Sequence, residues 1–150
     1  MQTYLNAAYI LSAIVLALGL LPAIPETPLL LAAALTVIVG MAHSILGERR
    51  LIRPLLQLPN LPHLPGQIDF TRATIRFAWH ITTIAWWGFA GVMAAMYFSP
   101  ESVNPPFLWV SCAVFACSGL IALAATRAAH KAWQFFFAIA ACCGYVALSA

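Results

Sequence analysis

The sequence predicts an all-α integral membrane protein, organised as a single domain over residues 1–150 and built as a bundle of five transmembrane helices. The first observation is composition: hydrophobic residues make up 63% of the chain, charged residues only 7%, and the mean hydropathy is +0.92. Soluble domains carry about 25% charged residues, so most of this surface has to contact the lipid bilayer. The second observation is five apolar segments of near-membrane length, and the third is that all seven Lys and Arg residues fall in two of the connections between them.

The length of each expected span is close to that of a membrane-crossing helix, which needs about 20 apolar residues. The spans cover residues 4–21, 29–46, 77–98, 107–126 and 132–150. Prolines separate the first span from the second and the third from the fourth, because proline fixes φ and cannot donate a backbone N–H. No Lys or Arg precedes the first span, unlike in a secretory signal peptide, so we expect this span to be retained.

The placement of charge predicts the orientation of the bundle. Five arginines lie within residues 47–76, and Arg127 and Lys131 lie between the last two spans, whereas the other two connections carry only Glu26 and Glu101. Basic connections stay on the cytoplasmic side, so we expect a cytoplasmic N-terminus and an extracytoplasmic C-terminus in a multi-pass protein of the bacterial inner membrane. The connection 47–76 is expected to lie as a loop in the headgroup layer, with residues 48–53 continuing the second span as an interfacial turn. A net charge of only +3, with all basic residues in two connections, does not favour nucleic acid as a partner.

Three of the four histidines are expected in one layer of the membrane. His43 lies four residues before Gly47, and His80 lies four residues after Arg76. At 1.5 Å of rise per residue, both imidazoles then lie about 5–6 Å inside the membrane boundary, on consecutive antiparallel helices. His130 lies near the start of the last span, in the same layer.

Small and polar residues form a stripe on each of these two consecutive spans. Spacings of three, four and seven residues align the members of a stripe on one helix face. One stripe contains Thr36, Gly40, His43 and Gly47, and the other contains Arg72, Arg76, His80, Thr83 and Trp87. Because a polar stripe is costly against hydrocarbon, we expect the two stripes to face each other, with Glu48 meeting Arg76 or Arg72.

Our first hypothesis is that this polar region binds a cofactor. Two imidazoles at equal depth on neighbouring helices suit the ligation of a b-type haem by His43 and His80. Gly40 and Gly47 leave room for the flat macrocycle, and Arg76 can pair with a propionate.

A transition metal is the alternative occupant of this region. His43, His80 and His130, with Glu48 or Asp69, offer nitrogen and oxygen ligands to Zn, Cu or Fe. The ligands occur singly, without an H-x-x-x-H or E-x-x-H pair, which argues against a di-iron or zincin site.

Two further hypotheses remain open. In one, the same histidine, glutamate and arginine side chains only clasp two helices of a non-catalytic accessory or scaffold subunit, since buried polar groups need partners in any bundle. In the other, a small membrane enzyme or carrier uses its arginines, Arg49, Arg50, Arg72 and Arg76, to bind a lipid, a quinone or an anionic metabolite at the cytoplasmic leaflet, with His80 as an acid or base. The sequence contains no nucleophile elbow, Walker loop or paired-carboxylate signature, so no residue is assigned a catalytic role.

The third span also carries features that point to helix packing. Trp86 and Trp87 fall near its middle, where an indole N–H needs a partner inside the bundle. Gly91 and Ala95 form a small-x-x-x-small pair that permits close helix contact. This pair predicts tight packing within the chain, in a homo-oligomer or in a larger membrane complex.

Overall fold

The computed structural model describes residues 27–62 and 66–150, and in this part of the chain every regular element is a helix. The elements are α2 (Thr27–Gly47), η1 (Glu48–Ile52), α3 (Arg53–Leu56), α4 (Ile68–Phe98), η2 (Pro100–Ser102), α5 (Pro105–Ala125) and α6 (Ala132–Ser149). The helical segments long and apolar enough to cross a membrane are Thr27–Leu56, Ile68–Phe98, Pro105–Ala125 and Ala132–Ser149. The prediction of long apolar helices is confirmed for these four. The span expected at residues 4–21 lies outside the described residues, so the five-span count and the orientation stay predictions.

The spans expected at 29–46 and 77–98 are the apolar parts of two longer helices. Residues 48–56 continue α2 through η1 and α3, and α4 begins at Ile68, so much of the loop expected over 47–76 is helical. Pro54 cannot donate to the carbonyl one turn before it. The helix passes this position through a π turn, in which the N–H of Arg53 donates to the carbonyl of Glu48. Arginines and Pro54 interrupt the apolar pattern here, but arginine and leucine are good helix formers, so the sequence of this segment is compatible with a continued helix.

A small apolar cluster holds these two helical extensions together. Ile52, Leu56 and Leu61 are buried, and Ile75 and Trp79 of α4 pack against them. The two segments have 30 and 31 residues, or about 45 Å at 1.5 Å per residue, whereas a hydrocarbon core is about 30 Å thick. The end formed by residues 48–62 and 66–76, called the hairpin tip below, is therefore long enough to project out of the apolar layer.

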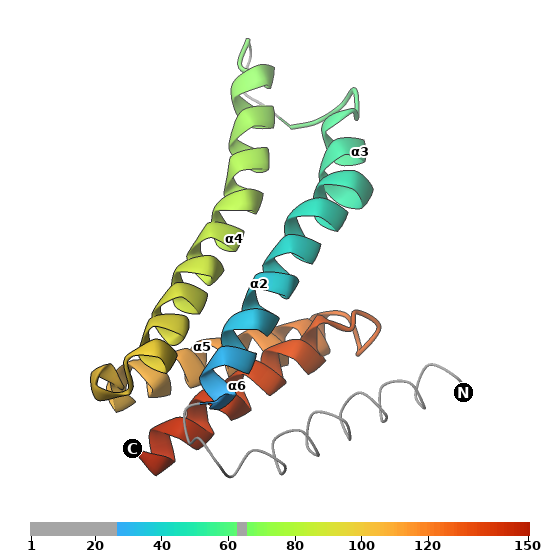
Figure 1. Cartoon of the computed structure of the whole chain (residues 1–150). Helices are drawn as coiled ribbons and strands as arrows, with labels where there is room; N and C mark the ends of the chain where they lie inside the picture. Colours follow the sequence, from blue (N-terminus) through green and yellow to red (C-terminus); the bar gives the residue numbers. More distant parts are fainter. Residues whose placement is uncertain (1–26, 63–65) are drawn as a thin grey trace.

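The described helices form two antiparallel pairs. α2 packs along α4, α5 packs along α6, and the two pairs meet mainly where α2 contacts α6. In Figure 1 the α5–α6 pair crosses the lower part of α2 and α4 obliquely, and the hairpin tip extends beyond it. The polar residues near that end are therefore carried mainly by α2 and α4.

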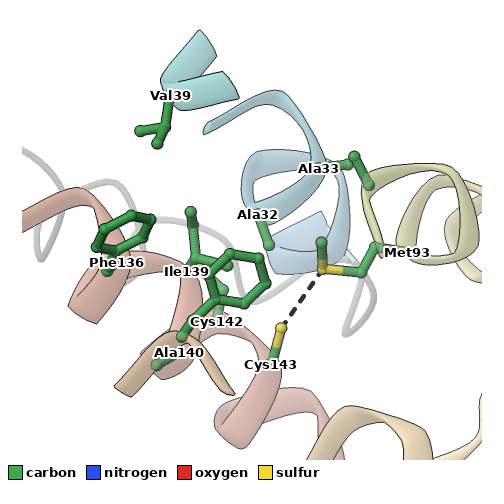
Figure 2. Packing of buried hydrophobic residues seen from close by; sticks show 11 residues of the cluster. Ala32, Ala33, Val39, Met93, Phe136, Ile139, Ala140, Cys142 and Cys143 are labelled. Carbon is green, nitrogen blue, oxygen red and sulfur yellow. Dashed lines mark hydrogen bonds between the residues drawn. The ribbon is translucent and has the colours of Figure 1, made fainter. Parts of the chain in front are cut away.

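The apolar core lies where the two pairs meet. Met93 of α4, Phe115 of α5 and Ile139 of α6 are fully buried there, beside the small side chain of Ala32 of α2. Figure 2 shows Cys143 next to Met93, with the thiol donating to the thioether sulfur at 3.5 Å. Thiol and thioether groups act here as adaptable apolar packing groups.

Gly119 allows close packing between α5 and α6, and this gives a first prediction. A Cβ at Gly119 would lie 2.8 Å from the ring of Phe137. Alanine improves helix propensity over glycine by about 1 kcal/mol, yet we expect Gly119→Ala to lower the midpoint of thermal unfolding in detergent, because Phe137 or the helices must move. Gly88→Ala is the matched control, since a Cβ there meets no described atom within 4 Å. A midpoint for Gly119→Ala at or above that of the control would contradict this packing.

Candidate functional site

A chain of side-chain hydrogen bonds connects α2 to α4. The hydroxyl of Ser44 lies 2.9 Å from Nδ1 of His80 and 2.8 Å from the hydroxyl of Thr83. The hydroxyl of Thr83 also lies 3.4 Å from the carbonyl oxygen of Gly40. His80 and Thr83 belong to the polar stripe expected on α4, and they face α2 as predicted. Because hydroxyl groups both donate and accept, Ser44 can bond to His80 and to Thr83 at the same time.

Glu48 connects this chain to the arginines of the hairpin tip. Its Oε1 lies 3.3 Å from Nη2 of Arg76 and 4.0 Å from Nε of Arg53, and its Oε2 lies 3.5 Å from Nε2 of His80. The Glu48 side chain is 20% exposed, and Oε2 is buried without a hydrogen bond to the described residues. A poorly solvated carboxylate needs positive neighbours. The predicted pairing of Glu48 with Arg76 is confirmed.

We call the side chains of Ser44, Glu48, Arg76, His80 and Thr83 the polar seam. They come from two helices that run antiparallel, and each of them has a partner on the other helix. The seam therefore bridges α2 and α4 over about two helical turns.

His43 has its own set of partners on α4. Its Nε2 lies 3.2 Å from the carbonyl oxygen of Trp79 and 3.0 Å from the hydroxyl of Thr82. A carbonyl can only accept, so this contact requires the proton on Nε2. The imidazole stacks on the indole of Trp79 with 4.2 Å between ring centroids, and Trp86 contacts it edge-on at 4.9 Å. The structure thus places His43 and His80 on facing helices, as predicted, but gives the two imidazoles separate partners.

Two tryptophans fill the space beside the glycines of α2. A Cβ at Gly40 would lie 2.6 Å from Nε1 of Trp87, and a Cβ at Gly47 would lie 2.5 Å from the indole of Trp79. Both indole N–H groups donate to α2, Trp87 to the carbonyl of Val37 at 3.4 Å and Trp79 to that of His43 at 3.1 Å. The partner expected for the Trp87 indole is therefore found. The spacing could have revealed this fit, because Gly40 and Gly47 are seven residues apart and Trp79 and Trp87 are eight apart on antiparallel helices.

The two indole rings determine whether a haem fits between α2 and α4. The space beside Gly40 and Gly47, expected to admit a macrocycle, holds two indole rings. His43 directs an N–H to a backbone carbonyl, and His80 has Ser44 at one ring nitrogen and Glu48 near the other. A bis-histidine haem does not fit between α2 and α4 in this arrangement.

The expected metal ligands are only partly brought together. Glu48 and His80 are neighbours, but His130 lies in the turn between α5 and α6. There its backbone N–H donates to the hydroxyl of Thr126, and its Nδ1 accepts from the N–H of Ala132. Over residues 27–62 and 66–150, no group of three or more His, Cys, Asp and Glu side chains is arranged to hold a metal ion.

Comparison with protein families, curated proteins and solved structures finds no match to this chain. The class of this protein is therefore described from its helical fold and its polar seam alone. The described part is an all-helical protein whose four long apolar helices can span a membrane, with a polar seam joining one helix pair.

The position of Ser44 gives a second prediction. Ser44→Ala removes the hydroxyl that both His80 and Thr83 contact, so we expect the free energy of unfolding to fall by about 1 kcal/mol. The measurement is an SDS titration of unfolding in mixed micelles. Ser118→Ala is the control, because the Ser118 hydroxyl donates to the Val114 carbonyl within its own helix. Equal losses for the two variants would show that the Ser44 contacts do not stabilise the helix pair.

Proposed function

We propose that the chain is a non-catalytic accessory or scaffold subunit of a membrane complex, and that its polar seam clasps α2 to α4. One observation carries this proposal: the seam side chains are partnered by one another across the two helices. A clasp needs this mutual pairing and requires no ligand. The indoles beside Gly40 and Gly47 support the same function, since they extend the close contact of α2 with α4 instead of leaving a cavity.

The proposal includes the topology expected from the sequence. The chain is a multi-pass protein of the bacterial inner membrane with five spans, a cytoplasmic N-terminus and an extracytoplasmic C-terminus. The hairpin tip supports this orientation because it carries five of the seven basic residues, which favour the cytoplasmic side. The seam then lies near the cytoplasmic end of α2 and α4.

An open face of α4 supports incorporation into a larger assembly. Among the described residues, no atom lies within 4 Å of a Cβ built at Gly88 or Gly91. Ala95 continues this face and is exposed. Small residues let two helix backbones approach closely in a membrane, so a helix of a partner chain or of a second copy can pack here.

A third prediction separates the clasp from a cofactor site. We expect His80→Asn to retain more thermal stability than His80→Leu, because an asparagine amide can still hydrogen-bond to Ser44, whereas leucine cannot. Thermal unfolding in detergent measures this difference. Visible absorption and elemental analysis of the same samples are expected to show neither haem nor stoichiometric metal. A Soret band with sharp reduced α and β bands in the wild type, lost in both His80→Asn and His43→Asn, would overturn the clasp in favour of haem ligation.

A fourth prediction tests the accessory role. Blue-native electrophoresis of membranes solubilised in mild detergent, with the chain expressed from its own gene, is expected to show a species larger than one chain. Gly91→Leu adds bulk to the small-residue face of α4 and is expected to shift the chain to the monomer position. Ala113→Leu, on an exposed position of α5, is the control and should leave the assembly intact. A wild-type chain that migrates only as a monomer would contradict the accessory role.

A further inference from the structure

An open cleft lies at the hairpin tip. The hairpin tip is the end of the α2–α4 pair that extends beyond α5 and α6 in Figure 1. Its volume is about 450 Å³. Arg53, Leu56 and Gln57 line one side, and Arg72 and Arg76 of α4 line the other. The cleft is therefore formed by residues from both helical extensions.

Three guanidinium groups give this cleft a positive charge. The nearby carboxylates are Glu48, which lies between Arg53 and Arg76, and Asp69, which is 3.6 Å from Arg72. The Asp69 side chain is 95% exposed, so water screens much of its charge. The Glu48 carboxylate is shared with His80 and the two arginines. Positive charge therefore exceeds negative charge along the cleft wall.

Two of the three arginines are already held in position. Nε of Arg72 donates to the carbonyl of Leu56 at 3.1 Å, and Nη2 of Arg76 lies 3.3 Å from Glu48. A guanidinium group has five N–H donors, so each of these side chains keeps further donors for a ligand. Side chains that are ordered before binding lower the entropic cost of binding.

The chemistry of the cleft favours phosphate. The planar fork of a guanidinium group matches two oxygens of a phosphate group. The cleft volume exceeds what one phosphate requires and lies within the about 300–1,000 Å³ of small-molecule sites. Leu56 offers an apolar surface and Gln57 an amide to the remainder of the ligand.

We propose that this cleft binds the phosphate group of an anionic ligand through Arg53, Arg72 and Arg76. The ligand is the headgroup of a membrane phospholipid or a soluble phosphorylated metabolite, because both present the same phosphate chemistry. This assignment goes beyond the clasp, which needs no ligand.

The experiment uses the full-length protein in two arms. In the first arm, inorganic phosphate is titrated into protein in phosphatidylcholine nanodiscs, and binding is followed by calorimetry. In the second arm, the protein is purified from mixed vesicles of phosphatidylcholine and phosphatidic acid, and native mass spectrometry counts the retained phosphatidic acid. Saturable phosphate binding indicates a soluble ligand, and retention of about one phosphatidic acid per chain indicates a lipid headgroup.

The variants are Arg53→Gln and Arg72→Gln, with Arg50→Gln as the matched control. Arg50 is exposed on η1, lies outside the cleft lining and carries the same charge. Loss of a charge-assisted contact at this partly exposed site is expected to weaken binding about fivefold or more in each cleft variant. Arg53→Lys keeps the charge without the fork and is expected to restore binding only in part. Thermal unfolding midpoints are measured for every variant, so that a loss of folding is not taken for a loss of binding.

Each outcome either supports or overturns the phosphate site. Binding in either arm that weakens in folded Arg53→Gln and Arg72→Gln but not in Arg50→Gln supports the phosphate site. Absence of binding in both arms overturns it, and so does an equal loss in Arg50→Gln, which would indicate diffuse surface charge. The clasp is tested separately by the stability of the seam variants, so failure of one proposal leaves the other standing.

Discussion

Mutual pairing of polar groups between α2 and α4 is the constraint on which the rest of this structure depends. A hydroxyl, imidazole or carboxylate that is shielded from water needs a hydrogen-bond or charge partner within the protein. Ser44 finds a partner on α4 only when His80 and Thr83 lie opposite, and Glu48 only when Arg76 does. A one-residue shift of either helix rotates its side chains by about 100° and breaks both sets of contacts. The polar seam therefore fixes the rotation and the register of the two helices.

The same register fixes two further features of the hairpin. It places Gly40 and Gly47 against the indoles of Trp87 and Trp79, which lets the helices approach closely while both N–H groups donate to α2. It also brings Arg53 beside the first three turns of α4, where Arg72 and Arg76 complete the arginine cleft. Packing, polar pairing and surface charge are thus three consequences of one alignment.

The sequence alone predicts the helical class and the layer in which the polar residues gather. Apolar length identifies the helices that are long enough to cross a membrane. Spacings of three and four residues place His80, Thr83 and Arg76 on the face that meets α2. Other features depend on contacts between helices, which the periodicity of the sequence does not indicate. The helix continues past Gly47 and Pro54 because Ile52 and Leu56 pack against α4, a contact that charge and proline content do not indicate.

The expected haem pocket is a second feature that depends on contacts between helices. Glycines on a polar stripe suit a macrocycle as well as they suit an aromatic side chain, and only the facing helix decides between the two. One partner of His43 is the backbone carbonyl of Trp79, which no pattern of side chains can indicate. Because the arginine cleft joins residues from 53–57 to 72–76, it also emerges only when the two helices are paired.

The coupling free energy between Ser44 and His80 tests most directly whether the polar seam clasps α2 to α4. Ser44→Ala, His80→Ala and the double variant form a double-mutant cycle, measured as free energies of unfolding in mixed micelles. We predict a favourable coupling of about 1 kcal/mol, because each single substitution already removes the shared hydrogen bond. Losses that add to within about 0.3 kcal/mol would show that the two side chains do not stabilise each other and would contradict the clasp.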